Sequence, residues 1–532
     1  MNPTGALLGL VLAALIVAIA AKRLDLPYPI ALVLAGSGMA FTPEFNAIEL
    51  DPELVFYILL PPILFEAAYF TSWRDFWRWR RAILLLAFGL TAATSAVVAV
   101  LCVYFIPGMN WATGFVLGAI VSPPDAAAAT SITRGLRLPR RIVQILEGES
   151  LVNDAAGLTV YRFAVAAVVT GTFSLTGALL SFLWIAIGGA VIGTLIGFAY
   201  VRLFPRIRHP EVELISTFLL SYLSYALAES VHASGVLATV AAGLVLGWHG
   251  PEIFSAMTRI RGVAVWQTVI FLINAMVFLL IGLQMPGVFR ALSGYPIGML
   301  TGWSVMISAG VILVRILWIF PSAYVPRLLS SAIREREPDP TWRAVTVVAW
   351  TGLRGVVSLA AAFALPVETH SGLPFPYRAL LLLLTLAVIV STLLLQGLTL
   401  RPLVRFLRLP EDRSSEEEEV RARIHATGQV LDHLAYLQQR GSAPEQILDR
   451  VRGFYEDRLA ELRSRLEEET AIETPERPGE FGSIAEQRVW WEVARIERQA
   501  LLDLRKSQEI GDEAMHQIER DIDLLEARIV PR

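Results

Sequence analysis

Long apolar runs separated by short polar breaks fill the first part of the chain, up to about residue 408. A helix needs about 20 mostly apolar residues to cross the hydrocarbon core of a bilayer. The runs meet this requirement repeatedly, so the pattern predicts an all-α membrane protein with about thirteen transmembrane helices. The expected spans are 4–21, 28–43, 53–70, 82–106, 111–131, 144–169, 175–201, 212–231, 233–248, 264–285, 296–320, 344–367 and 379–400.

Positive charges lie almost entirely in alternate loops between these spans. Short cytoplasmic loops retain Lys and Arg, so the loops that carry them are expected to face the cytoplasm. The even-numbered loops hold little positive charge beyond Arg290 and Arg378. The pattern predicts a multi-pass protein of the cell (inner) membrane with its N-terminus outside and its C-terminus in the cytoplasm. The positive residues of the odd-numbered loops are Lys22, Arg23, Arg74, Arg78, Arg80, Arg81, Arg134, Arg137, Arg140, Arg141, Arg202, Arg206, Arg208, Arg259, Arg261, Arg327, Arg334, Arg336 and Arg343, and Arg401, Arg405 and Arg408 follow the last span.

After the last span the chain becomes strongly charged and takes on helical periodicity. We therefore divide it into a transmembrane domain, 1–408, and a cytoplasmic helical C-terminal domain, 409–532. Ser442 and Glu445 form a capping box, and the helix behind them carries an apolar stripe. Further helical stretches follow a break at 474–482. Such a stripe is typical of a small bundle or a dimerising helix pair, and a ligand-sensing regulatory role is the alternative.

Composition supports the membrane class and excludes several others. Hydrophobic residues make up 55% of the 532 residues and charged residues 17%, unlike an ordinary soluble domain. The single cysteine, Cys102, rules out an intramolecular disulfide framework and a cysteine-based metal cluster. The arginines lie in short loops rather than on one basic face, so no nucleic-acid partner is expected. Lys22 and Arg23 follow the first apolar run, which favours a span over a cleaved signal peptide.

Ionisable residues inside apolar spans are costly, so each is a candidate for function or for a buried ion pair. In the sixth span, Glu149 and Asn153 are four residues apart, as are Ser150 and Asp154. Side chains at this spacing share a helix face, and the two faces adjoin to form one polar sector. The ionisable residues inside the spans are Glu66, Asp125, Glu147, Glu149, Asp154, Arg162, Arg315 and Arg354.

Asp154 is the member of this sector that best suits transport. A carboxylate at membrane depth can carry a proton or a cation in turn. Hard cations such as Na+ prefer oxygen ligands, which Asp154, Asp125 and Ser150 can supply. Asn153 can hold a helix or a carboxylate in place by hydrogen bonds. The sequence therefore predicts that these residues bind a transported monovalent cation.

The fifth and twelfth spans are each interrupted near mid-depth, at 122–124 and at 351–355. Non-helical backbone at this depth is tolerated where it lines a cavity, and paired interruptions point to a transporter binding site. Spans one to six and eight to thirteen would form two repeats of inverted topology, with the seventh joining them. Asp125 and Arg354 lie beside the breaks, where half-helix ends carry opposed partial charges. A simple proline kink is the alternative.

At four places the chain resembles the monovalent cation:proton antiporter family, the sodium/proton exchanger type found in bacteria, archaea and eukaryotes. The resemblance covers about residues 4–408 and implies a six-helix core that moves against a dimerisation domain, hence a homodimer. The matching motifs are Phe65-Glu66-Ala67, Asp125 after the broken fifth span, Gly148-Glu149-Ser150-Leu151-Val152-Asn153-Asp154, and Gly352-Leu353-Arg354-Gly355.

The resemblance also implies roles for the residues of the ion site. Asp154 would be the essential carboxylate that binds cation and proton in turn. Asp125 and Ser150 would help to ligate the ion. Asn153 would brace the broken fifth span against the sixth, and Glu66 would shape the approach to the site.

Further implications of the resemblance concern the scaffold and the stoichiometry. Glu149 and Arg354 would form a buried ion pair that holds core helices together. Exchangers with Asn directly before the essential Asp are typically electroneutral. The family often has Asp followed by Pro in the fifth span, whereas here Pro124 precedes Asp125 and Ala126 follows it. This departure leaves open which main-chain carbonyls ligate the ion and which of Na+, Li+ and K+ is preferred.

The function predicted from the sequence is secondary active exchange of a monovalent cation, Na+ first, for protons, serving cytoplasmic pH and cation homeostasis without a cofactor. A K+-preferring exchanger, a cation channel that uses the same vestibule, and a membrane-anchored sensor with a helical tail are the alternatives. The chain contains no His-Glu-x-x-His zinc helix and no paired intramembrane aspartates in a Gly-x-Gly-Asp context, so an enzyme is not expected.

Overall fold

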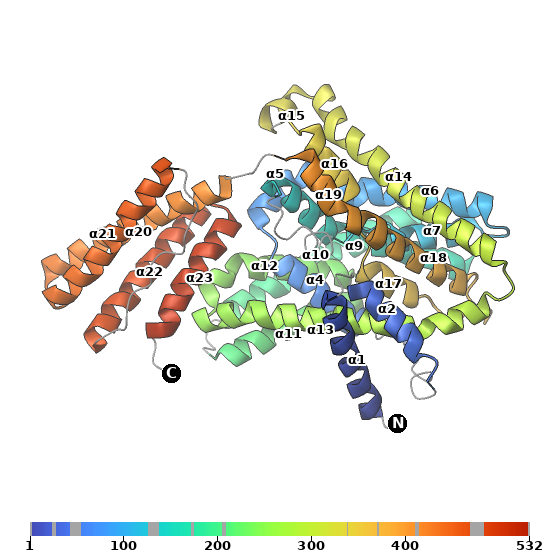
Figure 1. Ribbon diagram of the computed structural model, residues 1–532, viewed down its shortest axis with the longest axis horizontal. Helices are drawn as coiled ribbons and strands as arrows, with labels where there is room; N and C mark the ends of the chain where they lie inside the picture. The colour runs from blue at the N-terminus through green and yellow to red at the C-terminus, as the bar shows by residue number, and fades with distance from the viewer. Residues whose placement is uncertain are drawn as a thin grey trace.

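In the computed structural model, the chain folds into helices (Figure 1). The structure describes residues 3–23, 28–42, 55–125, 138–171, 175–204, 209–337, 339–369, 372–409, 414–468 and 483–529. Ala126, the end of the expected fifth span and the expected helix break at 474–482 lie outside these described residues.

The helices of the first half follow the apolar runs closely. Side chains cap several of them, as where Asn110 accepts a hydrogen bond from the Thr113 N–H at 2.9 Å at the start of α7. The fourth expected span is longer than its apolar core, because an amphipathic start rich in Trp and Arg continues into it without a break. The elements are α1 (Pro3–Arg23), α2 (Tyr28–Met39), η1 (Val55–Leu59), α4 (Leu60–Tyr69), α5 (Trp73–Leu84), η2 (Leu85–Leu90), α6 (Thr91–Phe105), α7 (Trp111–Val121), α9 (Arg140–Thr170) and α10 (Leu175–Leu203).

The second half repeats the pattern of long helices and one interrupted span. The elements are α11 (Pro210–Ser230), α12 (Gly235–Ile253), α13 (Ala256–Ala291), α14 (Ile297–Leu329), α15 (Ser331–Arg336), α16 (Trp342–Trp350), α17 (Val356–Phe363), α18 (Arg378–Ser391), η4 (Thr392–Gly397) and α19 (Leu398–Leu407). Each expected span overlaps a helix or an interrupted pair of helices. Within the described residues, seven helices are long and apolar enough to cross a membrane, and four shorter apolar helices accompany them.

The membrane-type helices pack as two groups. The core group comprises α5, α6, α7, α9, α14 and α16–α19, and the panel comprises α1, α2, α4 and α10–α13. Each group packs mainly within itself, and the contacts between the groups are sparser. Small residues allow close packing inside the panel: a Cβ on Gly36 of α2 or on Gly282 of α13 would collide with the backbone of the other helix.

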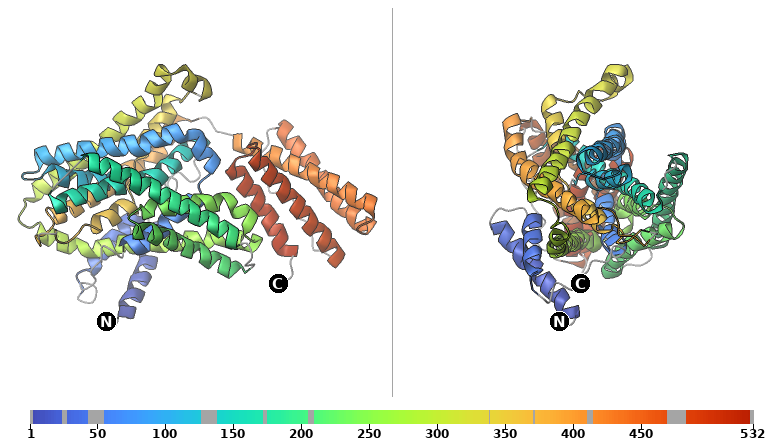
Figure 2. Two further views of the ribbon diagram at one scale, coloured as in Figure 1. Left: turned by 180° about the vertical axis from the view of Figure 1, so that it is seen from behind. Right: turned by 90° about the vertical axis from the view of Figure 1, so that its right-hand side faces the viewer.

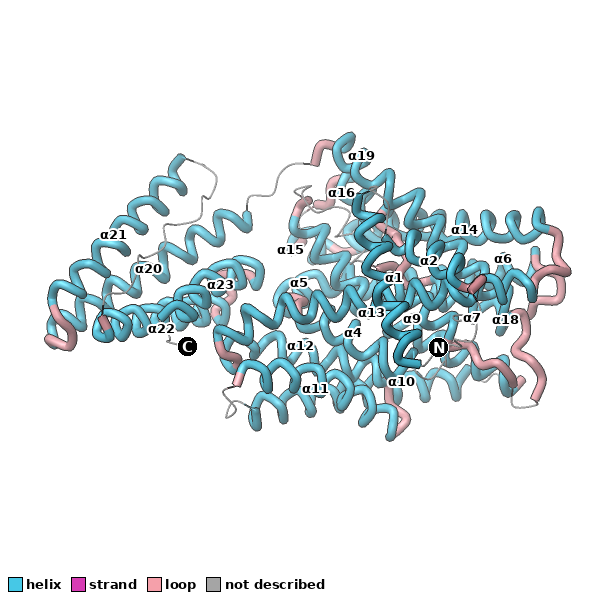
Figure 3. The backbone as a smooth tube through the Cα atoms, turned by 60° about the horizontal axis from the view of Figure 1, so that its bottom comes forward, coloured by secondary structure: helices cyan, strands magenta, loops and turns pink. Residues whose placement is uncertain are grey.

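The charged C-terminal segment folds into a helical bundle beside the membrane-type helices (Figures 1 and 2). We call its four helices the tail bundle: α20 (Ser414–Arg440), α21 (Glu445–Glu468), α22 (Ile484–Lys506) and α23 (Asp512–Ile529). Leu448, Val451 and Tyr455 of the expected stripe are buried, and Trp490 packs with them. The bundle lies against the end of the membrane-type helices at which α9 begins and α12 ends, as the tube view in Figure 3 shows from another side.

Candidate functional site

Helix α9 presents the polar sector that its sequence spacing predicted. It runs for 31 residues without interruption, and Glu149 and Asn153 are buried while Ser150 and Asp154 are partly exposed. The helix packs against α7, the helix that ends at the first break. Two side chains of the sector, Ser150 and Asn153, face the irregular backbone that follows α7.

The two helix breaks meet in space. The chain leaves helical geometry after Val121 and again between α16 and α17. The Asp125 N–H donates to the carbonyl oxygen of Leu353 at 2.6 Å, so the two irregular segments are hydrogen-bonded directly. This crossing explains how non-helical backbone is accommodated at membrane depth, because each segment satisfies part of the other.

One main-chain carbonyl of the first break faces the polar sector of α9. Ser150 Oγ lies 3.5 Å and Asn153 Nδ2 lies 3.4 Å from the carbonyl oxygen of Pro124. Asn153 thus connects α9 to the broken segment. Its Oδ1 atom is buried and has no hydrogen-bond partner among the described residues. The sequence indicated a bracing role for Asn153, but it did not indicate that the side-chain oxygen of Asn153 is a further polar atom beside the site.

Asp125 and Asp154 approach each other across this crossing. Their carboxylates lie close enough for the charge of one to act on the other. The Asp125 carboxylate also occupies the space that a Cβ at residue 355 would fill, so Gly355 is required for this close approach. The arrangement offers two carboxylates, the Ser150 hydroxyl and the Pro124 carbonyl, which are the oxygen ligands that alkali cations prefer.

The predicted ion pair between Glu149 and Arg354 is wrong. Both oxygens of Glu149 are bound by Arg315 of α14, at 2.6 and 2.9 Å, and both residues are fully buried. Arg354 instead donates to main-chain carbonyls: Nε lies 3.0 Å from the Val121 oxygen, and Nη1 bonds the Gly352 oxygen. The physical reason is that the breaks leave carbonyls without helical partners, and the adjacent arginine satisfies them.

Arg315 is the residue whose role the sequence did not reveal, although its position inside an apolar span had marked it as a candidate. Its guanidinium also donates to the carbonyl of Val348 near the end of α16, at 3.1 and 3.3 Å. The C-terminal ends of both interrupted helices, α7 and α16, are therefore each met by a buried arginine. This placement opposes the negative end of each helix dipole.

Glu66 lies in the panel rather than in the core group. It is a partly exposed residue of α4, and the carboxylate within electrostatic range of it is Glu147 of α9. Glu147 precedes Asp154 by seven residues, so both side chains lie on one face of α9. The structure thus brings Asp125, Ser150, Asn153 and Asp154 together and sets Glu66 across the boundary between the groups.

Nothing in the described residues resembles a resident metal centre. No group of three or more His, Cys, Asp or Glu side chains there is arranged to hold a metal ion.

Comparisons with known proteins agree with this architecture. A family model described as "Sodium/hydrogen exchanger, transmembrane" matches residues 10–406. An uncharacterised Na+/H+ exchanger of Mycobacterium tuberculosis is 32% identical over 530 residues, covering 98% of this chain and 96% of that protein. A sodium, potassium, lithium and rubidium/H+ antiporter of Bacillus subtilis is 33% identical over 388 residues, covering 70% of this chain and 57% of that protein.

The fold also has a solved counterpart. The structure of the sodium proton antiporter MjNhaP1 from Methanocaldococcus jannaschii at pH 8 superposes with a TM-score of 0.59, covering 76% of this chain and 99% of that chain. Its sequence identity is 20%, so this likeness concerns the fold alone. Together with the family match over most of the chain, these findings show that the chain belongs to the Na+/H+ exchanger family and is a multi-pass monovalent cation/proton antiporter, not an enzyme.

Proposed function

We propose that the chain exchanges Na+ for H+ one for one, with Asp154 as the carboxylate that carries either ion. The main observation behind this proposal is that Asp154 lies within electrostatic range of Asp125 at the crossing of two broken helices. Ser150, four residues before Asp154 on the same helix face, lies against the Pro124 carbonyl. A single carboxylate that binds either a cation or a proton, but never both, carries one monovalent cation in one direction and one proton in the other. Exchange through such a group is electroneutral.

We assign Asp125 and Ser150 as cation ligands, Asn153 as the brace between α9 and the first break, and Glu66 as a residue of the approach. Glu149 and Arg354 are assigned to the scaffold, each with the partner described above. The proposed topology has the N-terminus outside and the tail bundle in the cytoplasm, since the positive loops face that side. We further expect a homodimer, with residues 1–408 as the transport domain and 409–532 as the cytoplasmic domain.

K+ as the preferred cation is the second candidate. The Bacillus subtilis relative is named for exchange of sodium, potassium, lithium and rubidium. Carboxylate, hydroxyl and carbonyl oxygens bind all of these cations, so the ligand types alone do not choose among them. The departure at Pro124 and Asp125 affects the carbonyls that would set the size of the site.

The first test is exchange by purified protein in proteoliposomes that contain a pH-sensitive dye. A gradient of each alkali cation should drive proton movement, with Na+ most effective. We expect Asp154→Asn to abolish the signal, because a neutral amide can bind neither ion in exchange for the other. Asp339→Asn is the matched control, because Asp339 is 88% exposed and lies outside the crossing. Normal exchange by Asp154→Asn would refute the proposal.

Stoichiometry and the channel alternative need an electrical readout. An electroneutral exchanger should give no steady charge movement on solid-supported membranes while it moves protons. A current driven by voltage without proton counterflow would indicate a channel instead. Removing residues 412–532 addresses the sensor alternative, because a transporter should keep exchange without its tail.

A further inference from the structure

The tail bundle contacts the ends of both helix groups at once. On the core side, Glu418 of α20 accepts from Arg140 of α9 at 2.8 Å and from Arg74 of α5 at 3.3 Å. The Gly511 N–H, between α22 and α23, donates to the same carboxylate. Glu513 of α23 lies 3.5 Å from Arg140 as well. One glutamate of the tail thus binds two helices of the core group.

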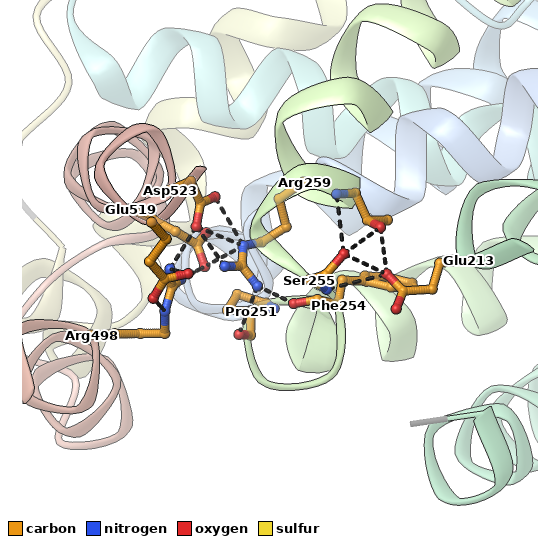
Figure 4. Close-up of polar contacts among 10 residues, drawn as sticks. Glu213, Pro251, Phe254, Ser255, Arg259, Arg498, Glu519 and Asp523 are labelled. Atoms are coloured by element: carbon orange, nitrogen blue, oxygen red, sulfur yellow. Dashed lines mark hydrogen bonds and ion pairs between the residues drawn. The ribbon is translucent and has the colours of Figure 1, made fainter. Parts of the chain in front are cut away.

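On the panel side, the contact centres on Arg259 at the start of α13 (Figure 4). Its guanidinium lies 2.5 Å from Asp523 and 3.3 Å from Glu519, both on α23. Arg498 of α22 approaches the same two carboxylates, at 2.6 and 3.2 Å. Only 10% of the Arg259 side chain is exposed, and 5% or less of either carboxylate side chain. Such pairs resist screening by salt more than exposed ones do.

A second panel contact joins α22 to the end of α12. Arg505 donates to the carbonyl of Trp248 at 2.8 Å, and its guanidinium carbon lies 4.3 Å from the centroid of the Trp248 ring. Lys506 adds an exposed pair with Glu252 at 2.7 Å. The start of α13 is in turn joined to α11, because Glu213 accepts hydrogen bonds from Ser255 and Thr258.

The core contact lies on the helix that carries the proposed ion carboxylate. Arg140 and Asp154 are separated by 14 residues of continuous α9, a distance of about 21 Å at 1.5 Å per residue. A long helix transmits a displacement of one end to the other. A body that is fastened both to α9 and to α12–α13 therefore opposes any movement of the core group against the panel.

We propose that the tail bundle is a clamp that bridges the core group and the panel and restrains exchange until it is released. The proposal rests on the proposed function, and on the expectation from the family resemblance that the helices carrying Asp154 move relative to the rest of the transport domain. Binding to both groups in one arrangement favours that arrangement over others by the differential free energy of these contacts. Loss of one side of the bridge frees the movement while the tail remains attached by the other.

The test compares Glu418→Gln with Glu417→Gln in full-length protein reconstituted into vesicles. Glu417 is the neighbouring residue of the same helix, and its ion pair with Arg421 is exposed and stays within the tail. We expect Glu418→Gln to raise the initial rate of cation-driven proton flux about five-fold, the population change that follows loss of one moderate contact. Glu417→Gln should match the wild type. An unchanged or lower rate in a folded Glu418→Gln protein would overturn the clamp.

A locking experiment provides a second, independent readout. Two cysteine pairs, one at Arg74 and Glu418 on the core side and one at Glu252 and Lys506 on the panel side, are each joined by a short cleavable bis-maleimide. With both sides linked, exchange should stop, and cleavage of the linkers should restore it. The native Cys102 is buried and contributes little background. Continued exchange in the linked protein would also overturn the clamp. Failure of the proposed function itself would look different, because the wild type would then show no exchange that Asp154→Asn abolishes.

Discussion

At the scale of single residues, the molecule separates the charges that hold the fold from those that suit transport. Glu149 and Asp154 lie five positions apart on α9. Glu149 accepts hydrogen bonds from Nη1 and Nη2 of Arg315, whereas Asp154 has a carboxylate as its charged neighbour. A carboxylate that is held in a strong ion pair with an arginine cannot readily bind and release a cation or a proton. The difference in surroundings, not in residue type, distinguishes the two roles.

Removing one partner of the buried pair should destabilise the protein strongly. We expect Glu149→Gln to lower the free energy of unfolding by about 3–5 kcal/mol, because Arg315 would be left buried without its counter-charge. The matched control is Arg261→Gln, whose pair with Glu211 is half exposed or more on both sides and should cost about 0–1 kcal/mol. Thermal unfolding in detergent measures both. Equal stability of the two variants would contradict the scaffold role of Glu149.

The sequence identified the residues near the site better than it identified their partners. Helical spacing was enough to place Glu149 with Asn153 and Ser150 with Asp154. It could not tell which of the three intramembrane arginines binds Glu149, because that choice depends on where tertiary packing places Arg315 of α14. Arg354 instead donates to main-chain carbonyls, among them that of Val121, which come within its reach because the two breaks cross. This crossing is a tertiary feature that neither segment's sequence shows.

At the scale of elements, α9 makes contacts outside the core group near both of its ends, with the tail bundle at Arg140 and with the panel at Arg162. Beyond Asp154, Arg162 binds Glu229 of α11 at 2.7 and 3.3 Å. Glu229 also accepts from the Gly235 N–H at 3.0 Å and so caps α12 within the panel. The pair therefore joins core to panel on the face of the molecule opposite the tail bundle.

The two helix breaks at 122–124 and 351–355 could be predicted from their Pro and Gly residues, whereas the sequences of the π-helical stretches η2 and η4 give no comparable signal.

Loss of the Arg162 contact should favour the arrangement that is open on that opposite face. We expect Arg162→Gln to lower the half-saturating cation concentration measured from that side, because apparent affinity rises with the fraction of binding-competent protein. Glu229 keeps its cap on α12 in this variant, so the panel is undisturbed. Vesicles of both orientations provide the measurement. The double change Arg162→Glu with Glu229→Arg should return the value toward wild type, and an unaltered value in Arg162→Gln would exclude a gating role.

At the scale of the whole molecule, the tail bundle docks through a cluster in which carboxylates outnumber arginines. Glu519, Asp523 and Glu526 face Arg259 and Arg498. Burial raises the pKa of Glu519 above its ordinary value, and Asp523 adds to this while the arginines oppose it. The groups that face Glu519 are Tyr69 of α4, Arg259 of α13, Arg498 of α22, and His516 and Asp523 of its own helix.

Docking of the tail should therefore depend on pH. A carboxyl whose pKa is raised in the docked state stabilises docking fully below its ordinary pKa, and this contribution is lost as pH rises through the raised value. We expect the tail to release more readily at alkaline than at mildly acidic pH. Spin labels at the exposed positions Arg261 of α13 and Arg520 of α23 would report the separation on the panel side. Glu519→Gln should remove most of the dependence, and a separation that is equally pH-dependent in this variant would assign it to another group.

The absence of a side chain at Gly355 restricts how this protein can evolve. Every single amino-acid replacement there adds a Cβ, and that atom would enter the volume of the Asp125 carboxylate. A replacement at residue 355 thus requires the Asp125 side chain to shift or to become smaller, whereas Asp125 can be replaced by a smaller residue without any change at Gly355. The constraint at this crossing therefore runs in one direction: a change in the first half of the chain must come before a change at residue 355 in the second half.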